Sequence, residues 1–188
     1  MYSNTHKFIF LHTGKCAGSS IKQALMSVAD IDTESHRGHT SLNEMFKCIR
    51  DSGHNHERYF KFGCVRNPWD REVSLYHHMS TVAKRWPNNP EKRKIQFDGT
   101  FEQFVNTSYE TYGDYSKLDH VIRYESLQYD FDIVCDRLRI DHVKLPCVDY
   151  NTGRPSREYK SYYNTNSQQI VAEKYAKAIE YFNYKFGK

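Results

Sequence analysis

Apolar and polar residues alternate along the chain in blocks that predict strands and helices in turn. Short apolar runs at residues 7–11, 58–65 and 119–124 predict strands, the first of them buried. Longer segments carry apolar residues at helical spacing and predict amphipathic helices. These helices cover about residues 18–29, 41–51, 127–140 and 167–186.

Capping residues and polar segments define the boundaries of several elements. Asn67-Pro68 places an N-cap residue before a proline at the first helical position. The segment at residues 100–103 resembles a capping box that opens a short helix. Residues 31–35 are expected to be extended, 86–99 to form a surface excursion and 145–163 to be irregular.

This order of elements predicts the fold class. Strands that alternate with helices imply right-handed crossovers and a central, mainly parallel sheet flanked by helices on both faces. We therefore expect a P-loop-like three-layer α/β fold, formed as one domain across residues 1–188. Ligands of such sheets bind at the carboxyl ends of the strands.

The balance of charged residues limits the classes of partner that the protein is expected to bind. The 27 Lys and Arg residues exceed the 23 Asp and Glu residues only slightly, for a formal charge of +4. This excess suits an anionic ligand but is too small for a nonspecific nucleic-acid binder, so no nucleic-acid partner is expected. No sequence feature predicts an oligomeric state.

The cysteines and the apolar runs bear on the cellular setting. The five cysteines are widely spread and form no Cys-x-x-Cys pair, which indicates thiols in a reducing compartment. No apolar run approaches the length of a membrane span, and the first predicted strand leaves no room for a signal peptide. We expect a cytoplasmic protein of a bacterium or a virus-infected cell, without a membrane partner.

The first candidate anion site follows the predicted strand at residues 7–11. Lys15 lies in the turn between that strand and the next helix, where backbone N–H groups point toward an incoming anion. Small and hydroxyl-bearing residues surround it: Gly14, Gly18, Ser19 and Ser20. The order of residues excludes a Walker A loop. An ordinary strand–turn–helix joint with a solvated lysine is the alternative.

The second candidate anion site follows the predicted strand at residues 58–65. Arg66 comes at the end of that strand, and Ser74 lies in the helix that Asn67-Pro68 begins. Both loops fall at the carboxyl edge of the predicted sheet, so we expect them to bind one ligand that has two anionic ends. The alternative for Arg66 is an ion pair with a nearby carboxylate.

Four segments, in this order, resemble a known family. They are residues 12–21 (HTGKCAGSSI), 66–76 (RNPWDREVSLY), 122–127 (IRYESL) and 181–186 (YFNYKF). They are similar to the motifs of sulfotransferases that use 3′-phosphoadenosine 5′-phosphosulfate (PAPS), with the carbohydrate sulfotransferases as the most similar branch. The resemblance covers nearly the whole chain and implies a single sulfotransferase domain.

The resemblance implies roles for the loop residues. Lys15 would contact the sulfuryl group and the bridging oxygen of the leaving phosphate, where its charge offsets negative charge that develops during transfer. Gly18, Ser19 and Ser20 would cradle the 5′-phosphate. Arg66 and Ser74 would hold the 3′-phosphate. Arg71 is expected to be solvated or structural.

Three residues of the first loop depart from the family pattern. Gly14 replaces the usual proline, Cys16 a threonine and Ala17 a glycine. The first change is expected to loosen the turn, and the second removes a hydroxyl. Since none of them removes the cation, we expect donor binding to survive in weakened form.

The acceptor hydroxyl must lose a proton when it attacks sulfur, and histidine is a common base. His39 follows the predicted strand at 31–35, where carbohydrate sulfotransferases place such a base, and His36 is its competitor. A surface or structural histidine is the alternative for each. Arg154 and Tyr159 belong to a basic, aromatic segment that the resemblance implies covers the donor or acceptor. A loop packed on the core is the alternative.

The predicted function is sulfuryl transfer from PAPS, as co-substrate, to a hydroxyl acceptor, with a carbohydrate as the expected acceptor, by in-line displacement. The histidines at 36, 39, 54 and 56 could form a cluster, but the cysteines show no ligand spacing and no catalytic carboxylate pattern accompanies them, so no metal is expected. Two alternatives stay open. One is a nucleotide kinase-like phosphotransferase, which would need magnesium and a Walker loop. The other is a non-catalytic nucleotide-binding module.

Overall fold

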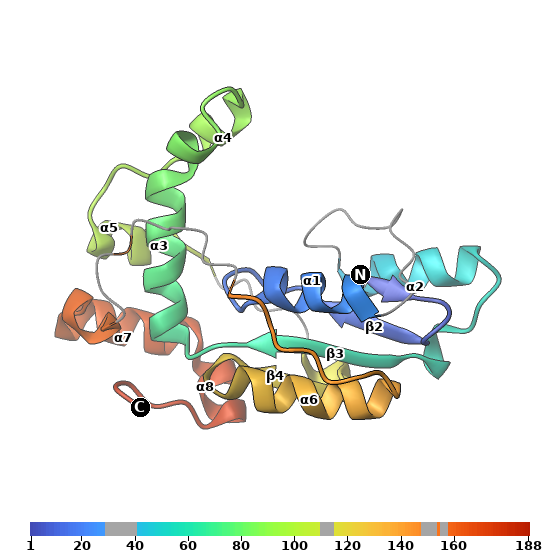
Figure 1. Ribbon diagram of the computed structural model, residues 1–188. Coiled ribbons are helices and arrows are strands. Elements are labelled where there is room, and N and C mark those ends of the chain that lie inside the picture. The colour runs from blue at the N-terminus through green and yellow to red at the C-terminus, as the bar shows by residue number, and fades with distance from the viewer. Residues whose placement is uncertain (29–40, 110–114, 148–153, 155–157) are drawn as a thin grey trace. The chain divides into compact units, whose positions relative to one another are not determined.

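The computed structural model describes residues 1–28, 41–109, 115–147, 154 and 158–188 (Figure 1). The chain divides into two compact units. The first unit consists of Met1–Arg66 and Thr111–Val148, and the second of Asn67–Glu110 and Asp149–Lys188. The expectation of one domain across residues 1–188 stays a prediction.

The first unit contains a four-stranded sheet in the order β1-β2-β3-β4. Its strands are β1 (Tyr2–Ser3), β2 (Phe8–Leu11), β3 (Phe60–Val65) and β4 (His120–Arg123). Strand β1 is antiparallel to β2, whereas β2, β3 and β4 are mutually parallel. The predicted mainly parallel sheet is confirmed, and β1 is an additional strand that no sequence pattern indicated.

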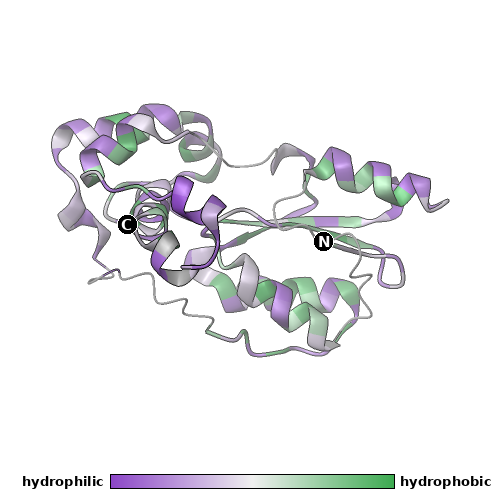
Figure 2. Ribbon diagram, turned by 90° about the horizontal axis from the view of Figure 1, so that it is seen from above, coloured by the Kyte–Doolittle hydropathy of each residue, from purple (hydrophilic) through white to green (hydrophobic). Residues whose placement is uncertain are grey.

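Helices pack against both faces of this sheet. They are α1 (Gly18–Val28), α2 (Leu42–Asp51) and α6 (Leu127–Leu138). Side chains alternate along β2, so that Phe8 and Phe10 join the core formed with α1 and α6. Ile9 and Leu11 join the second core, formed with α2. In Figure 2, hydrophobic residues follow the strands, and hydrophobic and hydrophilic residues interleave along the helices. The predicted α/β fold with covered sheet faces is confirmed.

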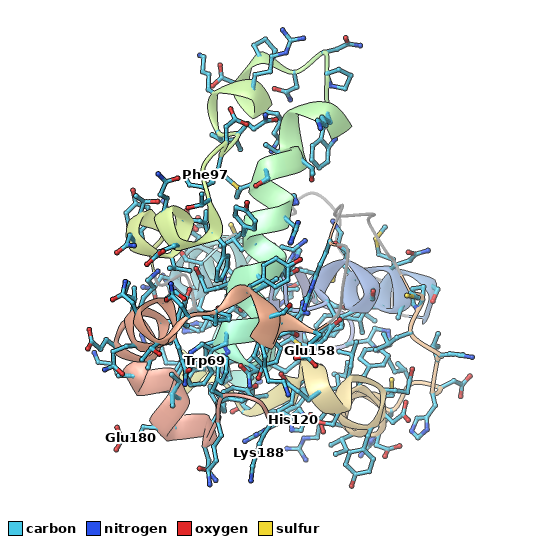
Figure 3. All side chains as sticks on the ribbon, turned by 90° about the vertical axis from the view of Figure 1, so that its left-hand side faces the viewer. Trp69, Phe97, His120, Glu158, Glu180 and Lys188 are labelled. Atoms are coloured by element: carbon cyan, nitrogen blue, oxygen red, sulfur yellow. The ribbon has the colours of Figure 1, made fainter. Side chains whose placement is uncertain are left out.

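The second unit is helical in its described part. Its helices are α3 (Pro68–Arg85), α4 (Pro90–Lys94), α5 (Phe101–Thr107), α7 (Thr165–Lys174) and α8 (Ala176–Phe182), with a 3-10 turn at Tyr159–Tyr162. Trp69, labelled in Figure 3, donates a hydrogen bond from Nε1 to the carbonyl oxygen of Gln168 and packs edge-on against Phe186. No helix in the described ranges of either unit is long and apolar enough to cross a membrane.

The predicted helix starts hold, and several boundaries shift. Asn67 caps α3 by accepting a hydrogen bond from the Trp69 amide, and Thr100 with Gln103 forms the expected capping box of α5. Strand β3 begins only at Phe60, because a 3-10 turn occupies His56–Arg58. Two further 3-10 turns lie at Tyr115–Lys117 and Tyr124–Ser126. The expected extended piece at residues 31–35 lies outside the described residues.

In the second unit, the surface excursion contains a helix, and one helix prediction is corrected. The polar excursion at 86–99 contains the short helix α4, which buries no residue. The single helix predicted for 167–186 is instead two helices, α7 and α8, which meet at Tyr175. Tyr175 leaves the helical conformation, with φ −106° and ψ 21°, and its side chain is fully buried. Tertiary contacts of this tyrosine therefore override the helical pattern around it.

Those contacts form a buried polar network around Glu72, which is fully inaccessible to solvent. Tyr175 donates a hydrogen bond to Glu72 Oε1 across 2.6 Å, and Arg71 donates to the Tyr175 hydroxyl across 3.0 Å. Ser108 donates to Glu72 Oε2 across 2.7 Å, and the Lys174 ammonium lies 3.8 Å from the same oxygen. A buried carboxylate requires such partners. Arg71 is thus structural and not solvated.

Candidate functional site

The site is built at the carboxyl edge of the sheet in the first unit. Strands β2, β3 and β4 are parallel, so their carboxyl ends lie on the same edge. Val65, the last residue of β3, pairs in register with Arg123, the last residue of β4. Arg66 and Tyr124 therefore leave the sheet side by side. The Lys15 loop leaves the sheet at the end of β2, the neighbour of β3.

The Lys15 loop has an unusual backbone. Lys15 has φ 65° and Ala17 has φ 58°, both in the left-handed region that residues with a Cβ seldom adopt. Each such residue costs about 1 kcal/mol or more relative to a right-handed conformation. Cys16, between them, is completely buried in the apolar core of the first unit. The loop is therefore anchored at Cys16 and held in a strained shape on either side of it.

Gly18 is required by the histidine that begins the loop. A Cβ atom placed on Gly18 would overlap the imidazole atoms Cδ2 and Nε2 of His12. The His12 ring in turn stacks on Phe10 of β2, with ring centroids 6.1 Å apart and an interplanar angle of 13°. A glycine at this position lets the imidazole lie directly against the start of α1. Sequence reasoning gave His12 no role, since a ring contact with a glycine has no sequence signal.

The N-terminus of α1 offers backbone donors beside the loop. The amides of Ser20 and Ile21 bond to the carbonyl oxygen of Ala17, at 3.0 and 3.1 Å. The helix begins at Gly18, so the amides of Gly18 and Ser19 precede these first helical bonds. The first turn of α1 contains no acidic residue. The helix dipole at this end therefore favours an anion.

Arg66 connects the second loop to the first. Its Nη1 donates a hydrogen bond to the backbone carbonyl oxygen of Lys15 across 3.1 Å. Its Cζ lies 3.9 Å from the centroid of the Tyr124 ring, which is the distance of a cation–π contact. Arg66 is only 7% exposed. The structure thus brings together the two cationic residues that the sequence placed in separate anion loops.

The remaining predicted donor ligands belong to the second unit. Ser74 is buried on α3. Arg154 forms an ion pair with Asp70 across 2.8 Å. Tyr159 accepts a hydrogen bond from the Gly187 amide across 2.7 Å, and its ring packs edge-on against Phe186. These contacts hold Arg154 and Tyr159 within the second unit, and donor binding by all three stays a prediction.

The two histidines predicted as the base, His36 and His39, lie outside the described residues. A different histidine, His77, belongs to the second unit and lies beside a hydroxyl group. His77 Nε2 lies 2.9 Å from the Tyr162 hydroxyl. Burial, and secondly the charge of Arg154, lowers the pKa of His77 below its usual 6.5. The imidazole is therefore mainly neutral at neutral pH.

The described residues contain no group of three or more His, Cys, Asp or Glu side chains that could hold a metal ion. Two of the histidines considered as ligands are placed: His54 is exposed, and the His56 ring packs on Phe46 with centroids 4.4 Å apart.

The sequence was compared with family models, curated proteins and solved structures. A family model described as the sulfotransferase family matches residues 1–185. No curated protein and no solved structure matches the chain. The family match spans nearly all of the 188 residues, and the mixed α/β fold with its loops at the carboxyl edge of the sheet agrees with it. The chain belongs to the sulfotransferase family.

Proposed function

We propose that the protein transfers the sulfuryl group of PAPS to a hydroxyl group of a carbohydrate. Family membership supports sulfuryl transfer in general. The observation that carries the choice of donor is the hydrogen bond between the Arg66 guanidinium and the Lys15 carbonyl. It joins two cation-bearing loops at one edge of the sheet, as a nucleotide with a phosphosulfate at one end and a phosphate at the other requires.

The 5′-phosphosulfate end is assigned to the Lys15 loop. The start of α1 presents amides near Gly18 and Ser19, and its first turn lacks carboxylates that would repel an anion. Ser20, one residue further on, adds a hydroxyl. Lys15 supplies the positive charge. These groups suit a phosphate linked to sulfate and need no metal ion to neutralise it.

The 3′-phosphate end is assigned to Arg66. A guanidinium has a planar fork of N–H donors that matches two phosphate oxygens. The ring of Tyr124 at 3.9 Å and the Lys15 carbonyl at 3.1 Å fix the plane of this fork. An arginine held in this way loses little side-chain entropy when it binds an anion.

In the reaction, the acceptor oxygen forms a bond to sulfur while the bond from sulfur to the bridging phosphate oxygen breaks. The leaving group is adenosine 3′,5′-bisphosphate, and Lys15 stabilises the negative charge that grows on its 5′-phosphate. A base takes the proton of the attacking hydroxyl. We assign this role to His39, with His36 as the competing candidate. Such a transfer depends on in-line geometry and charge stabilisation.

The carbohydrate acceptor rests on the resemblance of the loop motifs to carbohydrate sulfotransferases. A transfer assay tests it: the purified protein is incubated with PAPS carrying labelled sulfate and a panel of glycans. Label should appear in at least one glycan. Label found only in non-carbohydrate hydroxyl compounds would contradict the acceptor class. In a separate incubation of the same panel with ATP and magnesium, phosphate transfer from ATP would favour the kinase-like alternative.

A further inference from the structure

We propose that Arg66 is also a positioning residue for Lys15, in addition to its role toward the 3′-phosphate. Through its hydrogen bond to the Lys15 carbonyl, it holds the first loop in the shape that receives the 5′-phosphosulfate. This inference rests on the proposed function and deepens it. It predicts that the loss of Arg66 weakens recognition at the 5′ end of the nucleotide as well as at the 3′ end.

The Lys15 loop needs external support, because its backbone is strained. Two left-handed residues, Lys15 and Ala17, flank the buried Cys16. A peptide in this conformation relaxes unless neighbouring groups hold it. The bond from Arg66 fixes the carbonyl of Lys15 itself, the residue whose side chain carries the charge. It therefore acts at the point where relaxation would move the cation.

Arg66 is rigid enough to provide this support. It follows directly on β3, is 7% exposed, and stacks on Tyr124. Tyr124 follows directly on β4, which is paired with β3 up to the last residue of each strand. The arginine thus links the ends of β3 and β4 to the loop after β2.

The two roles of Arg66 are chemically compatible. A guanidinium carries five N–H donors in one plane. Donation to a backbone carbonyl on one side still allows a bidentate contact with a phosphate through other N–H groups. A neutral carbonyl and an anionic phosphate can therefore share one arginine, which ties the two ends of the nucleotide to a single side chain.

Binding of adenosine 5′-phosphate, which lacks the 3′-phosphate, separates the two roles. If Arg66 acts only on the 3′-phosphate, Arg66→Met leaves this affinity unchanged. The positioning role predicts a loss of about tenfold, the size of one lost hydrogen bond from a charged group. The matched control is Arg123→Met, which removes a charge at the exposed end of β4 next to the same edge. The control is expected to lose about twofold at most.

A second variant covers the case in which Arg66→Met does not fold. Arg66→Lys keeps a positive charge but lacks the planar fork. It should weaken the binding of adenosine 5′-phosphate more than Arg123→Met does. It should also lower kcat at saturating PAPS, whereas loss of a ground-state phosphate contact alone raises KM without changing kcat. Wild-type affinity for adenosine 5′-phosphate in Arg66→Lys, together with wild-type kcat, would overturn the positioning role.

A wrong donor assignment would give a different result from a wrong positioning role. If the unmutated protein binds adenosine 3′,5′-bisphosphate no better than adenosine 5′-phosphate, the 3′-phosphate assignment is wrong. The positioning role is then still decided by the adenosine 5′-phosphate affinities of the Arg66 and Arg123 variants.

Discussion

Arg66, the residue after β3, donates a hydrogen bond across 3.1 Å to the carbonyl oxygen of Lys15, in the loop after β2. The two residues are far apart in sequence and come from separate strand-to-helix segments. Their contact lies within the first unit, at the carboxyl edge of its parallel strands. It is the structural basis for assigning one bisphosphorylated nucleotide to both loops.

Lys15 is expected to matter more for turnover than for donor affinity. Because its charge acts on the phosphate as the sulfuryl group leaves, Lys15→Met should lower kcat about 100-fold or more. Affinity for adenosine 3′,5′-bisphosphate should fall by less than about tenfold. Steady-state kinetics and calorimetry measure the two quantities. Equal losses in both would argue against a transition-state role.

Gly18 is expected to tolerate no side chain while His12 is present. The added methyl group of Gly18→Ala would overlap the His12 ring, at a cost of about 1–3 kcal/mol in the free energy of unfolding. Urea denaturation measures this cost. In a His12→Ala background the overlap is absent, so Gly18→Ala should then cost little stability. An equal cost of Gly18→Ala with and without the His12 ring would show that the overlap is not the cause.

The buried network of the second unit is expected to be sensitive to a single oxygen. Tyr175→Phe leaves Glu72 and Arg71 without the hydroxyl that they share, which should cost about 1–3 kcal/mol. Tyr181→Phe is the matched control, because Tyr181 lies on the neighbouring helix α8 and is 63% exposed. The control should change stability by less than about 0.5 kcal/mol. Equal melting temperatures for both variants would contradict the structural role of the network.

His77 is expected to titrate below pH 6.5. Burial, the larger cause, and the charge of Arg154 both disfavour its protonated form. In the window between its lowered pKa and 6.5, the unfolded chain binds more protons than the folded one, so stability rises with pH there and falls on acidification. NMR titration of the His77 ring measures the pKa, and Arg154→Met should raise it part of the way. A His77 pKa at or above 6.5 would contradict the lowering of the pKa that burial and Arg154 are expected to cause.

Much of the fold could be predicted, because buried strands and capped helices leave strong local patterns. Strands β2, β3 and β4 lie within the predicted apolar runs, and Asn67 caps α3 as its sequence indicates. Strand β1 is too short to show an alternating pattern. Helix α4 buries no residue, so the polar sequence of α4 resembled a loop. The break at Tyr175 depends on hydrogen bonds to residues distant in sequence.

The candidate site was predictable as residue types but not as contacts. A cation in a glycine-containing turn and an arginine at a strand end have sequence signals, and these identified Lys15 and Arg66. The bond between them uses a backbone carbonyl, which every residue possesses and no pattern marks. The left-handed conformation of Lys15 and Ala17 was equally hidden, since neither is a glycine. The burial of Arg71 beside Glu72 depends on tertiary packing alone.

Calorimetric titration with adenosine 3′,5′-bisphosphate is the most direct test that one nucleotide spans the Lys15 loop and Arg66. The unmutated protein should bind this bisphosphate more tightly than adenosine 5′-phosphate, and Arg66→Met should abolish the difference. If the unmutated protein shows no binding of the bisphosphate, or if the difference persists without Arg66, the account is contradicted.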